Sequence, residues 1–322
     1  MKAVILAGGH ATRLWPITKN RAKPLLPLGE QPIIDYIVEE LDELEEIIIS
    51  TNEKFAKDFR EYAEEFERDN VSVVVESQDS EEEKPGTIGA IIKLLDDEDI
   101  EDDLLIVGGD NYFGLDFSEM LDFCEEKEGP VNVVYDVQDM EMASSFGIVD
   151  TDKRNDKISD FKEKPEEPPS TLASTAFYYF PEDQISLFHE YEEHFKDTDV
   201  PAEKYLDEPG RLIEWAHEET DMYAFSFDGD WFDIGTRKGY LDATKAVVSE
   251  NNISGDTKNC DIGENVIVME GAELENVKIE NSIIFNEAII KDSEVRNSLI
   301  DRNSDIEGAD LNGAIIGEHT TL

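Results

Sequence analysis

Short apolar runs alternate with amphipathic stretches through the first 250 residues, and this alternation constrains the fold more than any other feature. Buried strands are expected at residues 3–6, 47–50, 71–75 and 104–107. The stretches between them carry apolar side chains at helical spacing, as in residues 34–44, with acidic residues on the opposite face. Such alternation predicts an α/β fold, a Rossmann-like mixed and mostly parallel sheet with flanking helices, which binds ligands at the carboxyl ends of its strands.

The pattern changes after Glu250, where helical spacing disappears and short apolar pairs recur roughly every five to six residues. This period is close to the hexapeptide repeat of a parallel β-helix. Asn276, Asn281 and Asn286 fall at matching intervals and would turn its corners. A small antiparallel meander is the alternative. We therefore expect two domains, residues 1–250 and residues 251–322, the second a small left-handed parallel β-helix with a scaffolding role.

The chain is extremely acidic, since 78 Asp and Glu against 28 Lys and Arg give a formal net charge of −50. The acids recur in segments with regular apolar spacing, which argues against a disordered tail. Molar salt shortens the Debye length to about 3 Å and would screen their repulsion, so a salt-loving protein is expected. Nucleic-acid binding is excluded as a function, because it requires clusters of Lys and Arg.

Cellular location is indicated by the cysteines and the first residues. Cys124 and Cys260 are too few for a disulfide framework. The apolar stretch of residues 3–7 is too short for a signal peptide or a membrane span. A cytoplasmic protein without a membrane partner is expected.

Residues 6–29, LAGGHATRLWPITKNRAKPLLPLG, carry the strongest functional signal. Gly8 and Gly9 would let the backbone approach a phosphate, while Thr12 and Arg13 add a hydroxyl group and a permanent charge. The stretch lacks both the Walker A pattern and the dinucleotide fingerprint. Scarce positive charge gathers around this loop, and a polyphosphate ligand is expected; the cations are Lys19, Arg21 and Lys23 beside Arg13.

This stretch resembles the signature of the sugar-1-phosphate nucleotidylyltransferases, LAGGxGTRLxPLT followed by PKP, and most closely that of glucose-1-phosphate thymidylyltransferases. Later segments resemble further motifs of the family in the same order, at residues 107–111, 146–149, 161–165 and 231–236. The C-terminal repeat resembles the β-helical extension of many members. The chain is thus similar to an acidic, haloarchaeal type of member, with a catalytic domain over residues 1–250.

The resemblance implies a Mg²⁺-dependent enzyme that condenses a sugar 1-phosphate, glucose 1-phosphate foremost, with dTTP or UTP and releases pyrophosphate. It implies that the nucleotide is bound by Leu6, Ala7, Gly8, Gly9, His10, Ala11, Thr12, Arg13, Lys23, Gly86 and Asp110. The sugar phosphate would be bound by Gly147, Glu163, Lys164 and Thr175, and the metal by Asp110 and Asp233. The residues implied to be catalytic are Arg13, Lys23, Asp110, Lys164 and Asp233. Pro165 disfavours a helix at Lys164, which should therefore lie on an extended segment.

The chain departs from the family pattern at three positions. Ala11 and Ala176 stand where glycine is usual, and Ala22 stands where proline is usual. If position 11 requires a positive φ, alanine there costs about 1 kcal/mol.

Other readings of the function stay open. The sugar could be mannose or N-acetylglucosamine 1-phosphate with GTP or UTP. A non-catalytic regulatory or assembly relative, or a nucleotide-sugar sensor, is a different class of protein. The charged set of Lys23, Asp110, Lys164 and Asp233 argues for catalysis, because a silent relative has no need to keep all four. The flat coil faces of a β-helix are compatible with a homo-oligomer.

Overall fold

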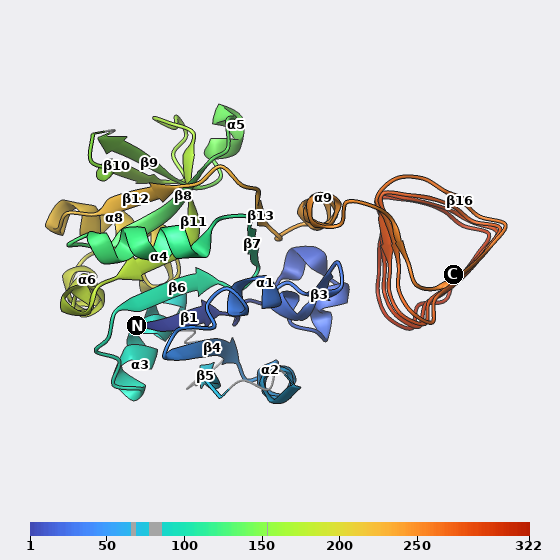
Figure 1. Cartoon of the computed structure of the whole chain (residues 1–322), viewed down its shortest axis with the longest axis horizontal. Coiled ribbons are helices and arrows are strands. Elements are labelled where there is room, and N and C mark those ends of the chain that lie inside the picture. Colours follow the sequence, from blue (N-terminus) through green and yellow to red (C-terminus); the bar gives the residue numbers. More distant parts are fainter. Residues whose placement is uncertain (66–68, 77–85, 153) are drawn as a thin grey trace. The chain divides into compact units, whose positions relative to one another are not determined.

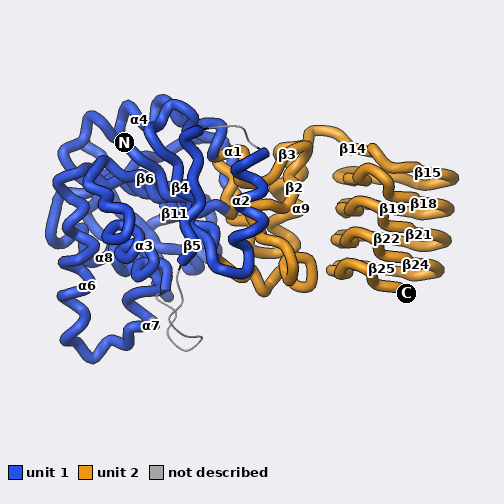
Figure 2. The backbone as a smooth tube through the Cα atoms, turned by 90° about the horizontal axis from the view of Figure 1, so that it is seen from below, with its two compact units in different colours: residues 1–8, 38–109, 114–231 blue, residues 9–37, 110–113, 232–322 orange. Residues whose placement is uncertain are grey.

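The computed structural model describes residues 1–65, 69–76, 86–152 and 154–322. Its contacts divide the chain into two compact units, each built from separate stretches of sequence (Figure 2). Unit 1 comprises Met1–Gly8, Val38–Gly109 and Gly114–Trp231; unit 2 comprises Gly9–Ile37, Asp110–Phe113 and Phe232–Leu322. No helix of the described residues is long and apolar enough to cross a membrane.

Unit 1 contains a nine-stranded mixed sheet of order β5-β4-β1-β6-β11-β8-β12-β10-β9 (Figure 1). Its strands are β1 (Lys2–Leu6), β4 (Glu46–Asn52), β5 (Val71–Glu76), β6 (Leu104–Gly108), β8 (Val131–Asp136), β9 (Gly147–Asp152), β10 (Lys157–Glu163), β11 (Leu172–Phe180) and β12 (Tyr223–Ser226). The first four to appear in the chain, β1, β4, β5 and β6, pair in parallel, as the sequence predicts. Strand β11 runs antiparallel between β6 and β8 and makes the sheet mixed.

Helices cover both faces of this sheet. Side chains of α3, α6 and α8 share one buried cluster with Val4 and Ile106 of the sheet. Tyr178 of β11 belongs to the same cluster. Its neighbour Phe177 therefore faces the opposite side of the sheet, where its ring contacts that of Phe117 of α4 at 5.9 Å between centroids. The helices of unit 1 are α2 (Ala56–Glu65), α3 (Gly86–Asp97), α4 (Phe117–Glu126), α5 (Met140–Ala143), α6 (Leu187–Lys196), α7 (Ala202–Tyr205) and α8 (Pro209–Glu219).

The helix expected at residues 34–44 is much shorter than predicted, since α1 covers only Asp35–Val38. The next eight residues include six carboxylates, Glu39, Glu40, Asp42, Glu43, Glu45 and Glu46. In a helix these like charges would meet at spacings of three and four, which destabilises it. The apolar spacing therefore continues beyond the residues that form the helix.

Unit 2 contains the predicted β-helix, whose triangular coils are seen end-on in Figure 1 and stacked in Figure 2. Its strands form three parallel sheets of order β14-β17-β20-β23-β26, β15-β18-β21-β24 and β16-β19-β22-β25, typical of a left-handed β-helix. The strands are β14 (Asn252–Ile253), β15 (Asp256–Lys258), β16 (Asp261–Ile262), β17 (Val266–Val268), β18 (Glu273–Glu275), β19 (Lys278–Glu280), β20 (Ser282–Ile284), β21 (Ile289–Lys291), β22 (Glu294–Arg296), β23 (Leu299–Ile300), β24 (Asp305–Glu307), β25 (Asp310–Asn312) and β26 (Ile315–Ile316). The alternative of an antiparallel meander is therefore wrong.

Asparagines turn the corners of the β-helix at positive φ, as at Asn276 (φ 57°) and Asn281 (φ 44°). One corner forms a continuous amide ladder: Asn265 Nδ2 donates to Asn281 Oδ1 over 2.6 Å, and Asn281 Nδ2 donates to Asn297 Oδ1 over 2.7 Å. The ladder satisfies polar groups between successive coils. At the third predicted position, the positive φ belongs to Glu287 rather than to Asn286.

The rest of unit 2 packs against one sheet of the β-helix. It contains β2 (Pro27–Leu28), β3 (Gln31–Pro32), β7 (Asn111–Phe113), α9 (Arg237–Val247), most of β13 (Trp231–Asp233), and 3₁₀ turns at Thr12–Leu14, Ile17–Lys19 and Lys23–Leu25. A shared core joins these segments to the coils, and its buried members are Leu14, Ile17, Leu26, Leu28, Ile33, Ile234, Tyr240, Leu241, Ala243, Ile267, Ile283, Phe285 and Leu299. The β-helix is therefore continuous with the residues that carry the glycine-rich loop.

Candidate active site

The carboxyl end of β1, in unit 1, is held by polar groups of β4. The Ala7 N–H donates to the Ser50 carbonyl oxygen over 2.8 Å, and Asn52 Nδ2 donates to the Gly8 carbonyl oxygen over 2.7 Å. The predicted nucleotide-binding residues Leu6, Ala7 and Gly8 lie at this strand end. Asn52 is absent from the predicted site; its sequence signal is a polar side chain at the end of a buried strand, β4.

The loop after Gly8 belongs to unit 2 and bends sharply at Ala11. Ala11 has φ 45° and ψ 46°, the left-handed conformation that favours glycine. Its carbonyl oxygen accepts hydrogen bonds from the Leu14 N–H and from Thr18 Oγ1, over 3.0 and 2.8 Å. The bend starts the turn that carries Thr12 and Arg13, both exposed to solvent. The loop keeps its bend although alanine occupies the usual glycine position.

Four of the predicted charged residues come together in unit 2. Lys23, with 7% of its surface exposed, forms an ion pair through Nζ with the carboxylate of Asp110. Asp110 directly precedes β7, which pairs with β13, and Asp233 ends β13. The Ile234 N–H donates to the Asp110 carbonyl oxygen over 3.2 Å. A Cβ built on Gly235 would lie 3.2 Å from Asp233 Oδ1 and 3.7 Å from Arg13 Cζ, so the guanidinium borders the same site.

The electrostatics of Asp233 reflect this grouping. Asp233 keeps contact with solvent, yet its pKa is raised, first because protein atoms displace water around the carboxylate and second because the Asp110 charge is close. Lys23 and Arg13 lower the pKa of Asp233 and so oppose both effects. The site therefore holds two carboxylates close enough for the charge of Asp110 to disfavour ionisation of Asp233.

A divalent cation would relieve that repulsion. Mg²⁺ is commonly held by one or two carboxylates, with phosphate oxygens and water completing its coordination. The pair of Asp110 and Asp233 has this composition. Within the part of the chain that the structure describes, no group of three or more His, Cys, Asp or Glu side chains has the geometry of a metal site. The two carboxylates fit a Mg²⁺ ion whose other ligands are phosphate oxygens and water.

A second group of predicted residues lies together in unit 1, around the β9–β10 hairpin. Gly147 and Glu163 are paired across the two strands. Lys164 Nζ lies 2.9 Å from Glu163 Oε1 and 3.7 Å from Glu208 Oε1, and its side chain is half exposed. Gly210, at the start of α8, leaves room for Glu163, because a Cβ there would fall 1.7 Å from Glu163 Oε2.

The backbone at Lys164 is not extended, contrary to the expectation from Pro165. Lys164 has φ 44°, and its N–H donates to the Phe146 carbonyl oxygen over 3.1 Å. Proline disfavours the right-handed helical region for the preceding residue, and here Lys164, directly after β10, adopts the left-handed region instead. Glu208 is a member of this group that the predicted set lacks. It pairs with both Lys164 and Arg211, and these cations help lower its pKa against the opposing effect of burial.

Two predicted ligand residues have structural partners. Thr175 is fully buried, and its Oγ1 donates to the Val133 carbonyl oxygen over 2.9 Å. Gly86, at φ 70°, begins α3 with its Cα close to the backbone of Leu206. Their ligand roles stay predictions.

Arg21, expected among the cations of the glycine-rich loop, contacts the β-helix instead. Its Nη2 lies 3.2 Å from Asp301 Oδ1, and its guanidinium carbon lies 5.3 Å from the centroid of the Phe285 ring. Lys19 is exposed.

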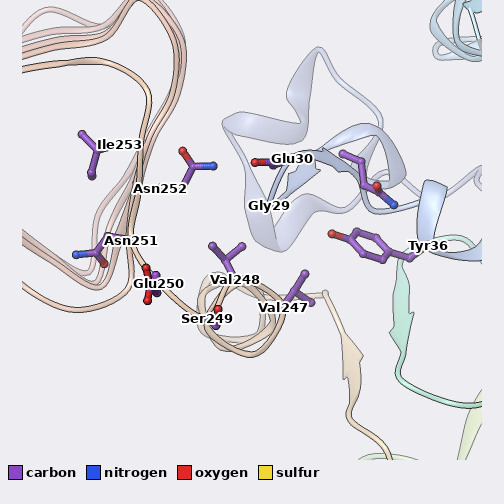
Figure 3. A pocket seen from close by; sticks show the side chains of 11 residues that line it. Gly29, Glu30, Tyr36, Val247, Val248, Ser249, Glu250, Asn251, Asn252 and Ile253 are labelled. Carbon is purple, nitrogen blue, oxygen red and sulfur yellow. The ribbon is translucent and has the colours of Figure 1, made fainter.

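An open cavity of about 570 Å³ lies elsewhere in unit 2 and is lined by none of the predicted site residues (Figure 3). It is bordered by the β2–β3 turn, by Tyr36, and by the chain that leads from α9 into the β-helix.

Glycines shortly after β1 and a buried lysine paired with an aspartate are features of phosphate-binding α/β proteins. The chain belongs to the nucleotidyl transferase family, whose model matches residues 2–250. Its relatives are sugar-1-phosphate nucleotidylyltransferases.

The similar proteins differ in the nucleotide that their names specify. A glucose-1-phosphate adenylyltransferase of Clostridium novyi (strain NT) is 30% identical, over 78% of this chain and 68% of the relative. A UTP–glucose-1-phosphate uridylyltransferase of Synechocystis sp. is 28% identical, over 77% of this chain and 64% of the relative.

Two further matches concern the fold and the chain length. A crystal structure from Bacillus anthracis, of a protein assigned as a glucose-1-phosphate thymidylyltransferase in complex with a sucrose, matches with a TM-score of 0.62 and 28% identity. The match covers 76% of this chain and 94% of that one. The bifunctional protein GlmU of Methanococcus aeolicus is 29% identical over 84% of this chain, which spans only 59% of that relative's length.

Proposed function

We propose that the protein transfers a nucleotidyl group from an NTP to a sugar 1-phosphate, giving an NDP-sugar and pyrophosphate. Glucose 1-phosphate is the proposed sugar substrate, with dTTP or UTP as the nucleotide. The observation that carries the proposal is the group of Lys23, Arg13, Asp110 and Asp233, where cations and carboxylates meet beside a glycine-rich loop.

In this reaction an oxygen of the sugar phosphate attacks the α-phosphorus of the NTP. The bond from the α-phosphorus to the bridging oxygen breaks, and pyrophosphate leaves with the electron pair. The attacking oxygen is already anionic, so no general base is needed. Catalysis then consists of bringing two anions together in line and stabilising the charge that develops on the leaving oxygens.

The residues of unit 2 are proposed to bind the triphosphate. The backbone of the loop from Gly9 to Thr12 approaches it, while Arg13 and Lys23 stabilise the departing pyrophosphate. Asp110 and Asp233 would hold Mg²⁺, which when bound supplies positive charge to the phosphate oxygens. The Lys23–Asp110 ion pair keeps the ammonium group oriented when no ligand is bound.

The residues of unit 1 are proposed to bind the sugar phosphate. Lys164 neutralises its phosphate, and Gly147 and Glu163 contact the sugar. The ion pairs of Lys164 with Glu163 and Glu208 support this role, because they place a cation beside carboxylates that can accept hydrogen bonds from sugar hydroxyl groups.

Four wider properties belong to the same proposal. The acidic composition fits a protein adapted to high salt, and the β-helix faces fit a homo-oligomer. Cytoplasmic location and a domain boundary near residue 250 also remain proposals.

The test is to incubate the protein with Mg²⁺ in concentrated KCl, with glucose, mannose or N-acetylglucosamine 1-phosphate and each of dTTP, UTP, GTP and ATP. Pyrophosphate release is measured, and glucose 1-phosphate with dTTP or UTP should be the fastest combination. Lys23→Ala should lower turnover by about two orders of magnitude, the scale expected when one charge-stabilising group is lost. Binding of nucleotide sugars without pyrophosphate release from any combination would instead identify a sensor.

A further inference from the structure

A buried ion pair joins the β-helix to the segment that carries Lys23. Asp301 follows β23 directly and is only 2% exposed. It accepts a hydrogen bond from the Arg302 N–H over 2.8 Å and forms the ion pair with Arg21. Burying a carboxylate is costly unless it is paired and hydrogen-bonded. The Asp301 side chain has both kinds of partner.

Asp301 interrupts an otherwise non-ionic column. Successive coils place Met269, Phe285, Asp301 and Gly317 at the same corner, each directly after the strand of one sheet. Backbone hydrogen bonds join the column, from the Phe285 N–H to the Ile300 carbonyl oxygen and from the Asp301 N–H to the Ile316 carbonyl oxygen. Coil stacking itself needs no carboxylate at this position, so the acid points to a partner outside the coils.

That partner segment is short and tightly held. Arg21 lies two residues before Lys23, and its guanidinium contacts both the Asp301 carboxylate and the Phe285 ring. Ala22 is fully buried, and the turn from Lys23 to Leu25 is closed by a hydrogen bond from the Leu26 N–H to the Lys23 carbonyl oxygen over 2.9 Å. The buried Leu26 belongs to the core shared with the coils. Movement of Arg21 would therefore be transmitted directly to Lys23.

We propose that Asp301 is a positioning residue: through Arg21 it fixes the turn that presents Lys23 to Asp110, so the β-helix takes part in catalysis. This inference rests on the proposed function for its kinetic consequence. The structural consequence, a turn at residues 22–26 held by the β-helix, does not require any activity.

The kinetic test compares Asp301→Asn with Asp310→Asn. Asp310 pairs with Arg296 on a different sheet of the β-helix, and its side chain is 69% exposed, so it is a matched control. We expect Asp301→Asn to lower kcat for pyrophosphate release by about tenfold or more with little change in either KM, because a displaced catalytic group slows the chemical step. Asp310→Asn should keep the wild-type kcat. Equal kcat in both folded variants would overturn the proposal.

Asp301→Asn leaves Arg21 without its charge partner, which is strongly destabilising. If it fails to fold, the double variant Arg21→Met, Asp301→Leu decides, since replacing both charges by apolar side chains of similar volume is often tolerated. The double variant should fold and show the same loss of kcat. A wild-type kcat in the double variant would overturn the proposal. Failure of both variants to fold would also overturn it, because the ion pair would then be a requirement of folding.

Amide hydrogen exchange separates this inference from the proposed function. Exchange of the Leu25 and Leu26 N–H groups should be about tenfold faster in Asp301→Asn than in wild type or Asp310→Asn, because the turn opens more often. If the wild type releases no pyrophosphate but this difference is found, the proposed function fails, and the structural part of the inference, a turn held by the β-helix, stands. If pyrophosphate is released and the exchange rates are equal, the positioning role fails alone.

Discussion

Ala11 carries a methyl group in a backbone conformation that glycine adopts without strain. The same holds for Ala176, at φ 56°, within β11. A residue with a Cβ in the left-handed conformation is strained by about 1–2 kcal/mol. Replacement by glycine removes this strain but raises the entropy of the unfolded chain, which destabilises the folded state by about 0.4–1 kcal/mol. The strain therefore outweighs the entropy term at both positions.

We expect Ala11→Gly to raise the free energy of unfolding by about 0.5–1 kcal/mol. Ala176→Gly should gain less, because the Ala176 methyl group packs against the main core of unit 1. Ala22→Gly is the control: Ala22 is fully buried at φ −63°, so glycine should be destabilising there by about 1 kcal/mol. Urea unfolding at fixed KCl measures all three. A loss in Ala11→Gly as large as that in Ala22→Gly would contradict the strain argument.

Glu76, at the end of β5, is a partly buried carboxylate beside Gly8 that the proposed reaction does not use. A Cβ built on Gly8 would lie 2.5 Å from Glu76 Oε1. Burial raises the pKa of Glu76, and a hydrogen bond from Ser50 Oγ, over 3.0 Å, partly opposes the shift.

Because the pKa of Glu76 is higher in the folded than in the unfolded state, its contribution to stability is fully present below the unfolded value. The contribution is lost as pH rises through the folded value. We therefore expect Glu76→Gln to gain stability relative to wild type as pH rises from the ordinary glutamate pKa to the raised one, and to keep that gain above it. Ser50→Ala removes the hydrogen bond that lowers the pKa of Glu76. In this variant the pH-dependent loss of stability caused by ionisation of Glu76 should therefore continue to higher pH. Urea unfolding across pH at fixed KCl measures this, and a constant difference between Glu76→Gln and wild type would rule the shift out.

At the scale of elements, the β-helix combines apolar pairs in its core with asparagines at its corners. Asn281 combines two tasks, a left-handed backbone and a place in the amide ladder. Glycine can perform the first task but not the second, and alanine can perform neither without strain.

We expect Asn281→Ala to destabilise unit 2 by about 2–3 kcal/mol and Asn281→Gly by about 1–2 kcal/mol, from lost hydrogen bonds and, in alanine, added strain. Asn286→Ala is the control, because that side chain makes one hydrogen bond, to the Glu270 carbonyl oxygen over 3.2 Å, outside the ladder. Thermal unfolding monitored by circular dichroism would rank the variants. A smaller loss for Asn281→Ala than for Asn286→Ala would show that the ladder contributes nothing.

The type of each element was more predictable from the sequence than the way in which the strands pair. The strands β1, β4, β5 and β6 and the β-helix follow from local apolar patterns, which reflect burial along a few residues. The antiparallel insertion of β11 between β6 and β8 depends on contacts between distant residues, which no local pattern records. The left-handed turn at Lys164 also escapes prediction, because the lysine side chain gives no signal for positive φ.

In the candidate site too, local sequence features were predictable and contacts between distant residues were not. Glycines, cations and acids next to predicted strand ends were recognisable from the motifs, and the structure groups Lys23 with Asp110 and Asp233. Glu208 and Asp301 lie far along the chain from the motif residues they contact. Asp301 had one local signal, an acid at a repeat position that is otherwise uncharged.

At the scale of the whole molecule, the net charge of −50 implies repulsion among the carboxylates at low ionic strength. We expect the midpoint of thermal unfolding to rise steeply with KCl up to about 1 M, where the Debye length falls to about 3 Å, and more gradually above it. Sucrose at matched osmolality is the control, because it leaves charge repulsion unscreened. A midpoint of thermal unfolding as high in dilute buffer as in 1 M KCl would contradict adaptation to salt.

Unit 2 has a consequence for how this protein can be divided. The chain crosses from one unit to the other after Gly8, Ile37, Gly109, Phe113 and Trp231. A gene fragment ending at residue 250 would keep the segment containing Leu14, Ile17 and Leu26 but lose Ile267, Ile283 and Phe285, which cover it. Removal or exchange of the coils alone would expose these apolar side chains, so in this chain the β-helix is not a detachable appendage.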